Sequence, residues 1–118
     1  MSLRSIAALA LAGAALVAVP ADAGTPTTRT VAVEDNFFAP ANLTVRAGTT
    51  IRWRWPAGGG DVHDVKLTSA PRGVRRFQSD PASSSFTFRR RLTKVGRYRF
   101  VCTFHIEDGM VMTVRVRR

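Results

Sequence analysis

Short segments in which apolar and polar residues alternate constrain the fold of this chain more than any other feature. In the stretch Thr50–Trp55, one isoleucine and two tryptophans share one face, while two arginines share the other. This period of two is typical of a half-buried antiparallel strand, whereas apolar residues on one face of a helix recur about every 3.6 residues. Similar segments, separated by turns rich in glycine and proline, lie at 30–33, 37–40, 43–46, 62–67, 85–92, 98–102 and 111–116. The pattern predicts an all-β sandwich or barrel without a helix.

The first 23 residues have the features of a secretory signal peptide. Arg4 gives a positive start, Ile6–Val19 is an uncharged apolar run, and Ala21-Asp22-Ala23 has the spacing of a cleavage site. A membrane anchor is the alternative, but a span needs about 20 apolar residues and this run has about fourteen. We therefore expect cleavage after Ala23 and export to the periplasm or the extracellular space. A flexible arm at 24–28 and a single domain at 29–118 should follow.

The sequence is strongly basic, with 18 lysines and arginines against 8 aspartates and glutamates and a formal net charge of +10. A field of this sign should speed encounters with acidic partner proteins, or bring the protein to an anionic membrane surface. Nucleic acid is another polyanion, but an exported chain without a nucleic-acid-binding motif is not expected to bind it. We expect the domain to be a monomer.

One cysteine, two histidines and a methionine form the most informative set of side chains. Cys102, His105 and Met110 lie within nine residues, between two predicted strands, so a single loop can bring them together. A thiolate, an imidazole and a thioether are soft ligands suited to copper, although zinc would bind the same groups. One more imidazole would complete a site of two histidines, one cysteine and a weak axial methionine, and His63 is the only other histidine. Taken singly, each of these residues is as readily explained as a packed or surface side chain.

The order and spacing of these residues resemble those of the cupredoxins, in particular the plastocyanin-like small blue-copper proteins. The pattern of that family is a histidine at the start of a strand and then C-x₂-H-x₄-M near the C-terminus, which His63 and Cys102–Met110 match. Tyr98 and Phe100 match the aromatic-x-aromatic-x-Cys lead-in, and the resemblance covers nearly all of residues 29–117. It implies a Greek-key β-sandwich of about seven to eight strands, and a cupredoxin-like copper-binding domain at 29–118.

The resemblance also implies the roles of the ligands. One copper ion would be held by the Cys102 thiolate, by the imidazoles of His63 and His105, and by Met110 as the weak axial ligand. Met112 falls inside the last predicted strand and is expected to pack there instead.

Three positions beside the ligands depart from the family pattern. Asp64 stands where the family commonly has an asparagine that braces the ligand loops, and Phe104 and Ile106 flank His105 where proline is frequent. These differences concern the rigidity of the site and not the identity of its ligands.

The family resemblance implies a type 1 blue-copper protein that shuttles single electrons between redox partners and is not an enzyme. A copper-binding or copper-delivery protein of the cell envelope is the alternative, but such proteins often favour methionine-rich sites, and this chain has three methionines including the first residue. A metal-free interaction module would leave the order of the ligands unexplained. A copper oxidase or nitrite reductase needs a second, histidine-rich centre, which two histidines cannot supply.

Overall fold

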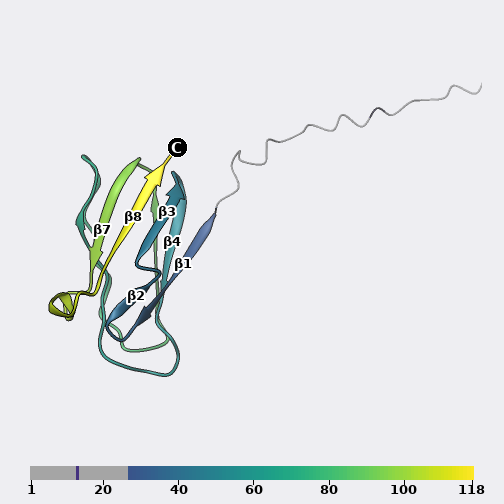
Figure 1. Cartoon of the computed structure of the whole chain (residues 1–118). Coiled ribbons are helices and arrows are strands. Elements are labelled where there is room, and N and C mark those ends of the chain that lie inside the picture. Colours follow the sequence, from purple (N-terminus) through teal and green to yellow (C-terminus); the bar gives the residue numbers. More distant parts are fainter. Residues whose placement is uncertain (1–12, 14–26) are drawn as a thin grey trace, which may run out of the picture.

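Two stacked β-sheets form the domain, as Figure 1 shows for the computed structural model, which describes Gly13 and residues 27–118. The described residues contain eight strands and one short 3₁₀ helix, so the predicted all-β sandwich of about seven to eight strands is confirmed. The elements are β1 (Thr28–Glu34), β2 (Phe37–Ala39), β3 (Asn42–Arg46), β4 (Thr49–Arg54), β5 (Lys66–Ser69), β6 (Thr87–Leu92), β7 (Gly96–Val101), η1 (Ile106–Asp108) and β8 (Val111–Arg117).

The first strand begins at the last residue of the stretch predicted as a flexible arm. Thr28 opens β1, and the carbonyl oxygen of Thr27 accepts a hydrogen bond from the Thr50 N–H at 2.9 Å, so the sheet includes the end of the stretch predicted as an arm. The predicted signal peptide and residues 24–26 lie outside the described residues, apart from Gly13. Within the part of the chain that the structure describes, no helix has the length and apolar character needed to cross a membrane.

Each sheet has four strands and mixes parallel with antiparallel pairs. The strand order is β2-β1-β4-β6 in one sheet and β3-β8-β7-β5 in the other. Strand β4 runs antiparallel to β6 but parallel to β1, so the antiparallel pairing predicted for this stretch holds on one side only. Alternation reports which face of a strand is buried, and it carries no information on the direction of the neighbours.

The core lies between the sheets and is centred on Trp53. Its indole ring contacts Phe100 at 4.8 Å and Phe88 at 5.8 Å between ring centroids, in tilted and edge-on geometries that aromatic pairs favour. The indole N–H donates to the sulfur of Met112 at 3.2 Å, and Met112 is fully buried. Met112 therefore packs in the core, as expected from its place in the last strand.

The stretch 62–67, predicted as a continuous strand, pairs regularly only from Lys66 onward. His63 forms an isolated antiparallel bridge with Ala82, and β5 begins three residues later. Between them, the N–H of Val65 donates to the side chain of Ser79 at 2.9 Å, in place of a carbonyl oxygen on a neighbouring strand. The chain between β5 and β6 thus takes the place of a strand here, and it fixes His63 at one end of the sandwich.

Candidate metal centre

The loop between β7 and β8 is tied into a compact turn by its own backbone. The N–H of Cys102 donates to the carbonyl oxygen of Met110 at 3.0 Å, and the N–H of Met110 donates to the carbonyl oxygen of His105 at 3.1 Å. The N–H of His105 returns to the carbonyl oxygen of Cys102 at 3.2 Å. Gly109 closes η1 in the left-handed region at φ 77°, where a side chain costs free energy. The nine-residue loop predicted from the sequence is therefore a closed unit.

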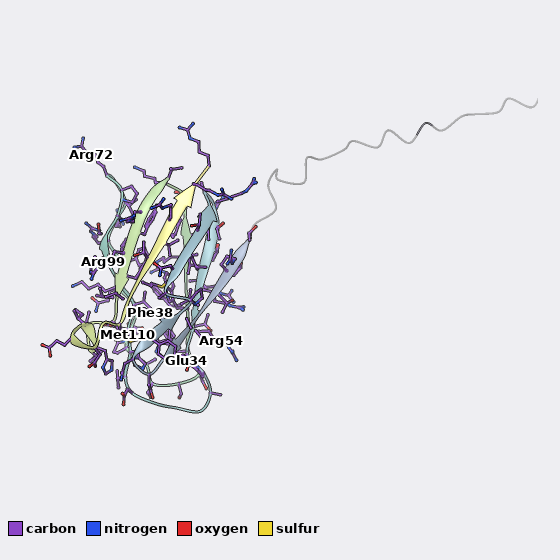
Figure 2. All side chains as sticks on the ribbon, viewed as in Figure 1. Glu34, Phe38, Arg54, Arg72, Arg99 and Met110 are labelled. Carbon is purple, nitrogen blue, oxygen red and sulfur yellow. The ribbon has the colours of Figure 1, made fainter. Side chains whose placement is uncertain are left out.

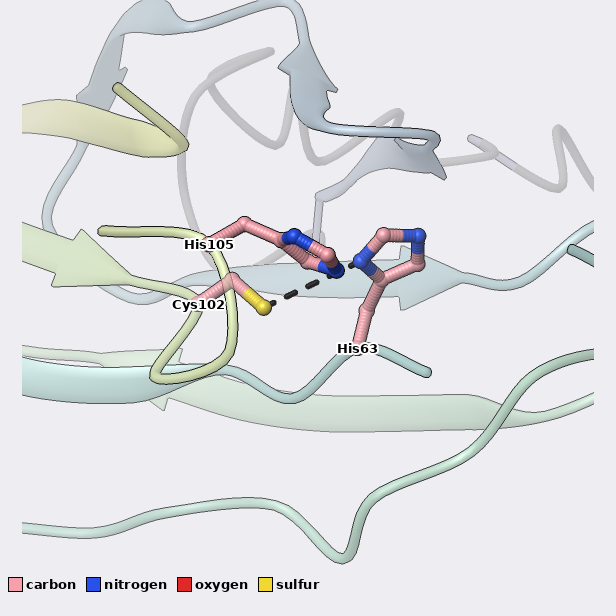
Figure 3. A group of neighbouring side chains, drawn as sticks. All are labelled: His63, Cys102 and His105. Atoms are coloured by element: carbon pink, nitrogen blue, oxygen red, sulfur yellow. Dashed lines mark hydrogen bonds between the residues drawn. The ribbon is translucent and has the colours of Figure 1, made fainter. Parts of the chain in front are cut away.

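His63 reaches this loop from the segment between β4 and β5, which connects the two sheets. Two backbone hydrogen bonds with Ala82, of 2.9 and 3.0 Å, hold it in place. Nδ1 of its ring lies 3.8 Å from Sγ of Cys102, and its ring centroid lies 4.9 Å from that of His105 (Figure 3). One ligand atom from each of His63, Cys102 and His105 lies within 4.8 Å of the others, so three of the four predicted ligands meet at one point.

Met110, the fourth predicted ligand, is fully buried directly before β8. Its backbone is bonded to both Cys102 and His105, which places the residue beside the three clustered side chains. Figure 2 shows Met110 at the end of the sandwich that carries the β7–β8 loop. The structure thus places the fourth residue at the site, and its role as axial ligand remains a prediction.

A carboxylate from the β1–β2 turn holds the His63 ring. Oδ1 of Asp35 lies 2.8 Å from Nε2 of His63 and also accepts the N–H of Asp61 at 2.9 Å. The hydrogen bond with His63, followed by that with Asp61, lowers the pKa of Asp35. A Cβ at Gly60 would lie 2.7 Å from this carboxylate, so the glycine-rich loop allows the close approach. The contact orients the imidazole, because Nε2 on a carboxylate leaves Nδ1 facing Cys102.

Asp64 ties the two ligand-bearing segments together. Its carboxylate, almost fully buried, accepts the N–H of Thr103 at 2.7 Å, the hydroxyl of Thr103 at 2.6 Å and the side-chain amide of Gln78 at 2.8 Å. Since Thr103 follows Cys102 directly, Asp64 links the segment of His63 to the β7–β8 loop. Asp64 therefore braces the two ligand loops through its carboxylate, at the position where the family commonly has an asparagine.

The surroundings of Cys102 favour the neutral thiol in the absence of a metal. Burial raises the pKa of the thiol, while backbone hydrogen bonds at Asp64, Phe104 and His105 act in the opposite direction and do not outweigh it. A cation is therefore needed to stabilise the thiolate. The soft, buried donor set of one sulfur and two imidazoles suits copper by its chemistry.

The exposed edge of the site is at His105. Its side chain is 17% exposed, whereas that of His63 is 3% exposed. Nδ1 of His105 lies 3.2 Å from the carboxylate of Asp108, so each imidazole has one nitrogen on a carboxylate and one available for a metal ion. Phe104 and Ile106 on either side are about half exposed. This edge is the accessible approach to the site.

Sequence analysis missed the two carboxylates that contact the histidines. Asp35 lies 28 residues before His63, in a turn between two strands, and no spacing rule joins such positions. Asp108 had a local signal, since it is three residues after His105 in a loop that folds back on itself.

The sequence of this chain is similar to those of known copper-binding proteins, which agrees with the metal site described above. Residues 27–117 match the model of the copper-binding proteins of the plastocyanin/azurin family. Halocyanin of Natronomonas pharaonis is 38% identical over 80 residues, which are 67% of this chain and 47% of halocyanin. The chain thus spans about half the length of this curated relative.

Solved structures show the same fold. Pseudoazurin from Methylobacterium extorquens is 25% identical, with a TM-score of 0.65 and coverage of 75% of this chain and 74% of pseudoazurin. A copper-containing nitrite reductase from Thermus scotoductus is 28% identical, with a TM-score of 0.63 and coverage of 86% of this chain but only 25% of the reductase.

These matches and the site define a small copper-binding protein of the cupredoxin fold. The chain belongs to the plastocyanin/azurin family of copper-binding proteins. Copper is accordingly the cofactor of this domain.

Proposed function

We propose that this protein is an exported type 1 blue-copper protein that carries single electrons between redox partners. The observation that carries the proposal is the convergence of His63, Cys102 and His105, whose ligand atoms lie within 4.8 Å of one another. Met110 is the proposed weak axial ligand of the same ion. Copper, when bound, supplies a couple of two oxidation states that differ by one electron.

The residues of this chain hold the ligands in place for that chemistry. Asp35 orients the His63 ring, and Asp64 fixes the segment of His63 against Thr103. Ligands that are held by such contacts have little freedom to rearrange when the charge of the site changes. His105 is the proposed point of electron entry and exit, because it is the more exposed of the two imidazoles.

The proposal extends to location and partners. The N-terminal sequence supports export with cleavage near Ala23, and the net charge of +10 supports acidic redox partners or association with an anionic membrane surface. We propose a monomer with one copper ion and no binding of nucleic acid.

A carrier is favoured over an enzyme because both histidines of the chain are used in the one site. A histidine-rich second copper centre would need residues that this chain does not contain. The nitrite reductase is matched over a quarter of its length only, so the resemblance extends to a domain of that enzyme and not to the whole.

Copper titration tests the proposal. Addition of Cu(II) to the mature metal-free protein should produce an intense visible absorption band at one equivalent, and ascorbate should bleach it reversibly. The Cys102→Ser variant should stay colourless while keeping its fold. A colourless wild-type complex would refute the blue-copper site, and rapid loss of Cu(I) to a chelator would favour copper delivery over electron transfer.

A further inference from the structure

A basic cavity lies at the end of the sandwich away from the metal site. It is open to solvent, has a volume of about 520 Å³ and is lined by the segment 73–77, the end of β6 and the β6–β7 turn. Five of the described residues that line it are basic and none is acidic. The basic residues are Arg75, Arg76, Arg90, Arg91 and Lys94.

The distance from the metal site separates this cavity from the electron-transfer edge. Tyr98, which also lines the cavity, precedes Cys102 by four residues along β7, or roughly 13 Å at 3.3 Å per strand residue. Lys94 lies further on, beyond the start of the strand. In Figure 2, Arg72, which adjoins the cavity segment, stands at the opposite end of the domain from Met110.

Several contacts fix the cationic groups in position. The guanidinium of Arg90 lies 4.3 Å from the ring centroid of Phe88 and 5.2 Å from that of Phe77, and its Nη1 donates to the carbonyl oxygen of Arg89. Nζ of Lys94 donates to the carbonyl oxygen of Arg72 at 3.0 Å. The remaining donors of these groups are held in place before any ligand arrives, which lowers the entropic cost of binding.

These five charges have no counter-charge in the part of the chain that the structure describes. None of the five side chains forms an ion pair with a carboxylate of residues 27–118. The Nε of Arg91 donates to the carbonyl oxygen of Gly48 at 3.1 Å, and Gly48 does not line the cavity. The other four charges repel one another, and they focus a positive potential on the space between them. A bound anion of more than one charge would relieve the repulsion.

We propose that this cavity binds a multivalent oxyanion of the phosphate class. Guanidinium groups suit such a ligand because their planar N–H forks pair with two oxygens of one phosphate. Val74 and Leu92 also line the cavity, so an apolar part of the ligand can lie beside its phosphate group. The phosphate comes from a free polyphosphate or from the headgroup of an anionic lipid.

Calorimetric titration of the copper-loaded protein with pyrophosphate tests the site. One equivalent should bind, and the double variant Arg75→Gln, Arg76→Gln should bind at least about tenfold more weakly, as expected for the loss of charge-assisted hydrogen bonds. The matched control is Arg97→Gln, Arg115→Gln, which loses the same charge from exposed residues paired across β7 and β8. This control should bind within about threefold of the wild type.

Equal weakening in the two double variants would overturn the proposal, because it would show attraction by net charge alone. Binding that does not saturate would overturn it as well. The single variant Arg75→Gln replaces the double one if that does not fold, and an unchanged visible band shows that the copper site is intact. Binding can therefore fail while the blue-copper function stands, and the reverse also holds.

Vesicles of phosphatidylglycerol and phosphatidylcholine distinguish the two sources of phosphate. Vesicle binding that pyrophosphate displaces, and that the cavity variant loses more than the control, would assign the site to lipid headgroups. Pyrophosphate binding without vesicle binding would assign it to a free polyphosphate. Vesicle binding of equal strength in both double variants, together with no saturable binding of pyrophosphate, would refute the site.

Discussion

Replacement of Asp64 offers the sharpest test of how the site is held. The carboxylate accepts three hydrogen bonds of 2.6 to 2.8 Å while only 2% of the residue is exposed. In Asp64→Ala all three are lost. Each hydrogen bond to a charged group contributes about 1.5–3 kcal/mol. Thr103 and Gln78 are exposed and can bond to water instead, so we use the lower figure for the two bonds to Thr103 and less for Gln78. The two bonds to Thr103 then give about 3 kcal/mol, and the bond to Gln78 raises the expected loss of unfolding free energy somewhat above this figure.

Asp64→Asn should cost much less, because an amide can rebuild the network. Its oxygen can accept the N–H of Thr103, and its N–H₂ can donate to the Thr103 hydroxyl once that group rotates. The side-chain amide of Gln78 can turn to present its oxygen. We expect a loss of about 1 kcal/mol, in line with the asparagine that the family commonly has at this position.

Urea unfolding of the metal-free protein measures these differences without a contribution from metal binding. Asp80→Ala is the control, since Asp80 is an exposed carboxylate near the same segment and should change the free energy by less than about 0.5 kcal/mol. A loss of less than about 1 kcal/mol in Asp64→Ala, or equal losses in the alanine and asparagine variants, would refute the bracing role.

Other predictions concern neighbouring residues. The pKa of Asp35 in the folded protein is lowered from 3.8, so its contribution to stability is complete above pH 3.8 and is lost as the pH falls through the lowered pKa. Acid unfolding of the metal-free protein should show this loss of stability, and the Asp35→Asn variant should not show it. Gly109→Ala should lower the unfolding free energy by about 1 kcal/mol in denaturant titrations, since φ is 77° and no atom lies within 4 Å to add a clash. Met110→Gln should keep the blue colour but lower the reduction potential in voltammetry, because a harder axial oxygen favours Cu(II).

Most of the fold could be predicted from the sequence because alternation survives wherever a strand lies between core and solvent. In β8 the buried and accessible residues alternate along the whole strand. The same rule failed at 62–67, where Asp64 is buried between His63 and Val65. Its burial comes from hydrogen bonds to Thr103 and Gln78, which are contacts from elsewhere in the chain, and a local pattern cannot contain them.

In the candidate site as well, the residues that could be predicted are those indicated by local sequence. Cys102, His105 and Met110 belong to one loop, so their spacing alone indicates that they meet. His63 could be found because the chain has no other histidine to offer. Asp35 could not be found, since its contact with His63 depends on how the β1–β2 turn and the glycine-rich loop pack at one end of the sandwich.

The distribution of charge changes what the net charge implies about partners. All the acidic residues of the described part lie in or beside segments that carry the metal site. They are Glu34, Asp35, Asp61, Asp64, Asp80, Glu107 and Asp108. The excess of positive charge therefore belongs to the strands and to the cavity at the other end.

An acidic partner drawn by the overall charge would consequently be attracted first to the end that is remote from His105. The surface around His105, the proposed point of electron transfer, instead presents the exposed apolar side chains of Phe104 and Ile106, with the carboxylate of Asp108 close by. Screening by salt should weaken the first interaction much more than the second, because apolar contact does not depend on ionic strength in this way. Electron exchange at one end and anion binding at the other are thus compatible on a single domain, and neither needs to displace the other.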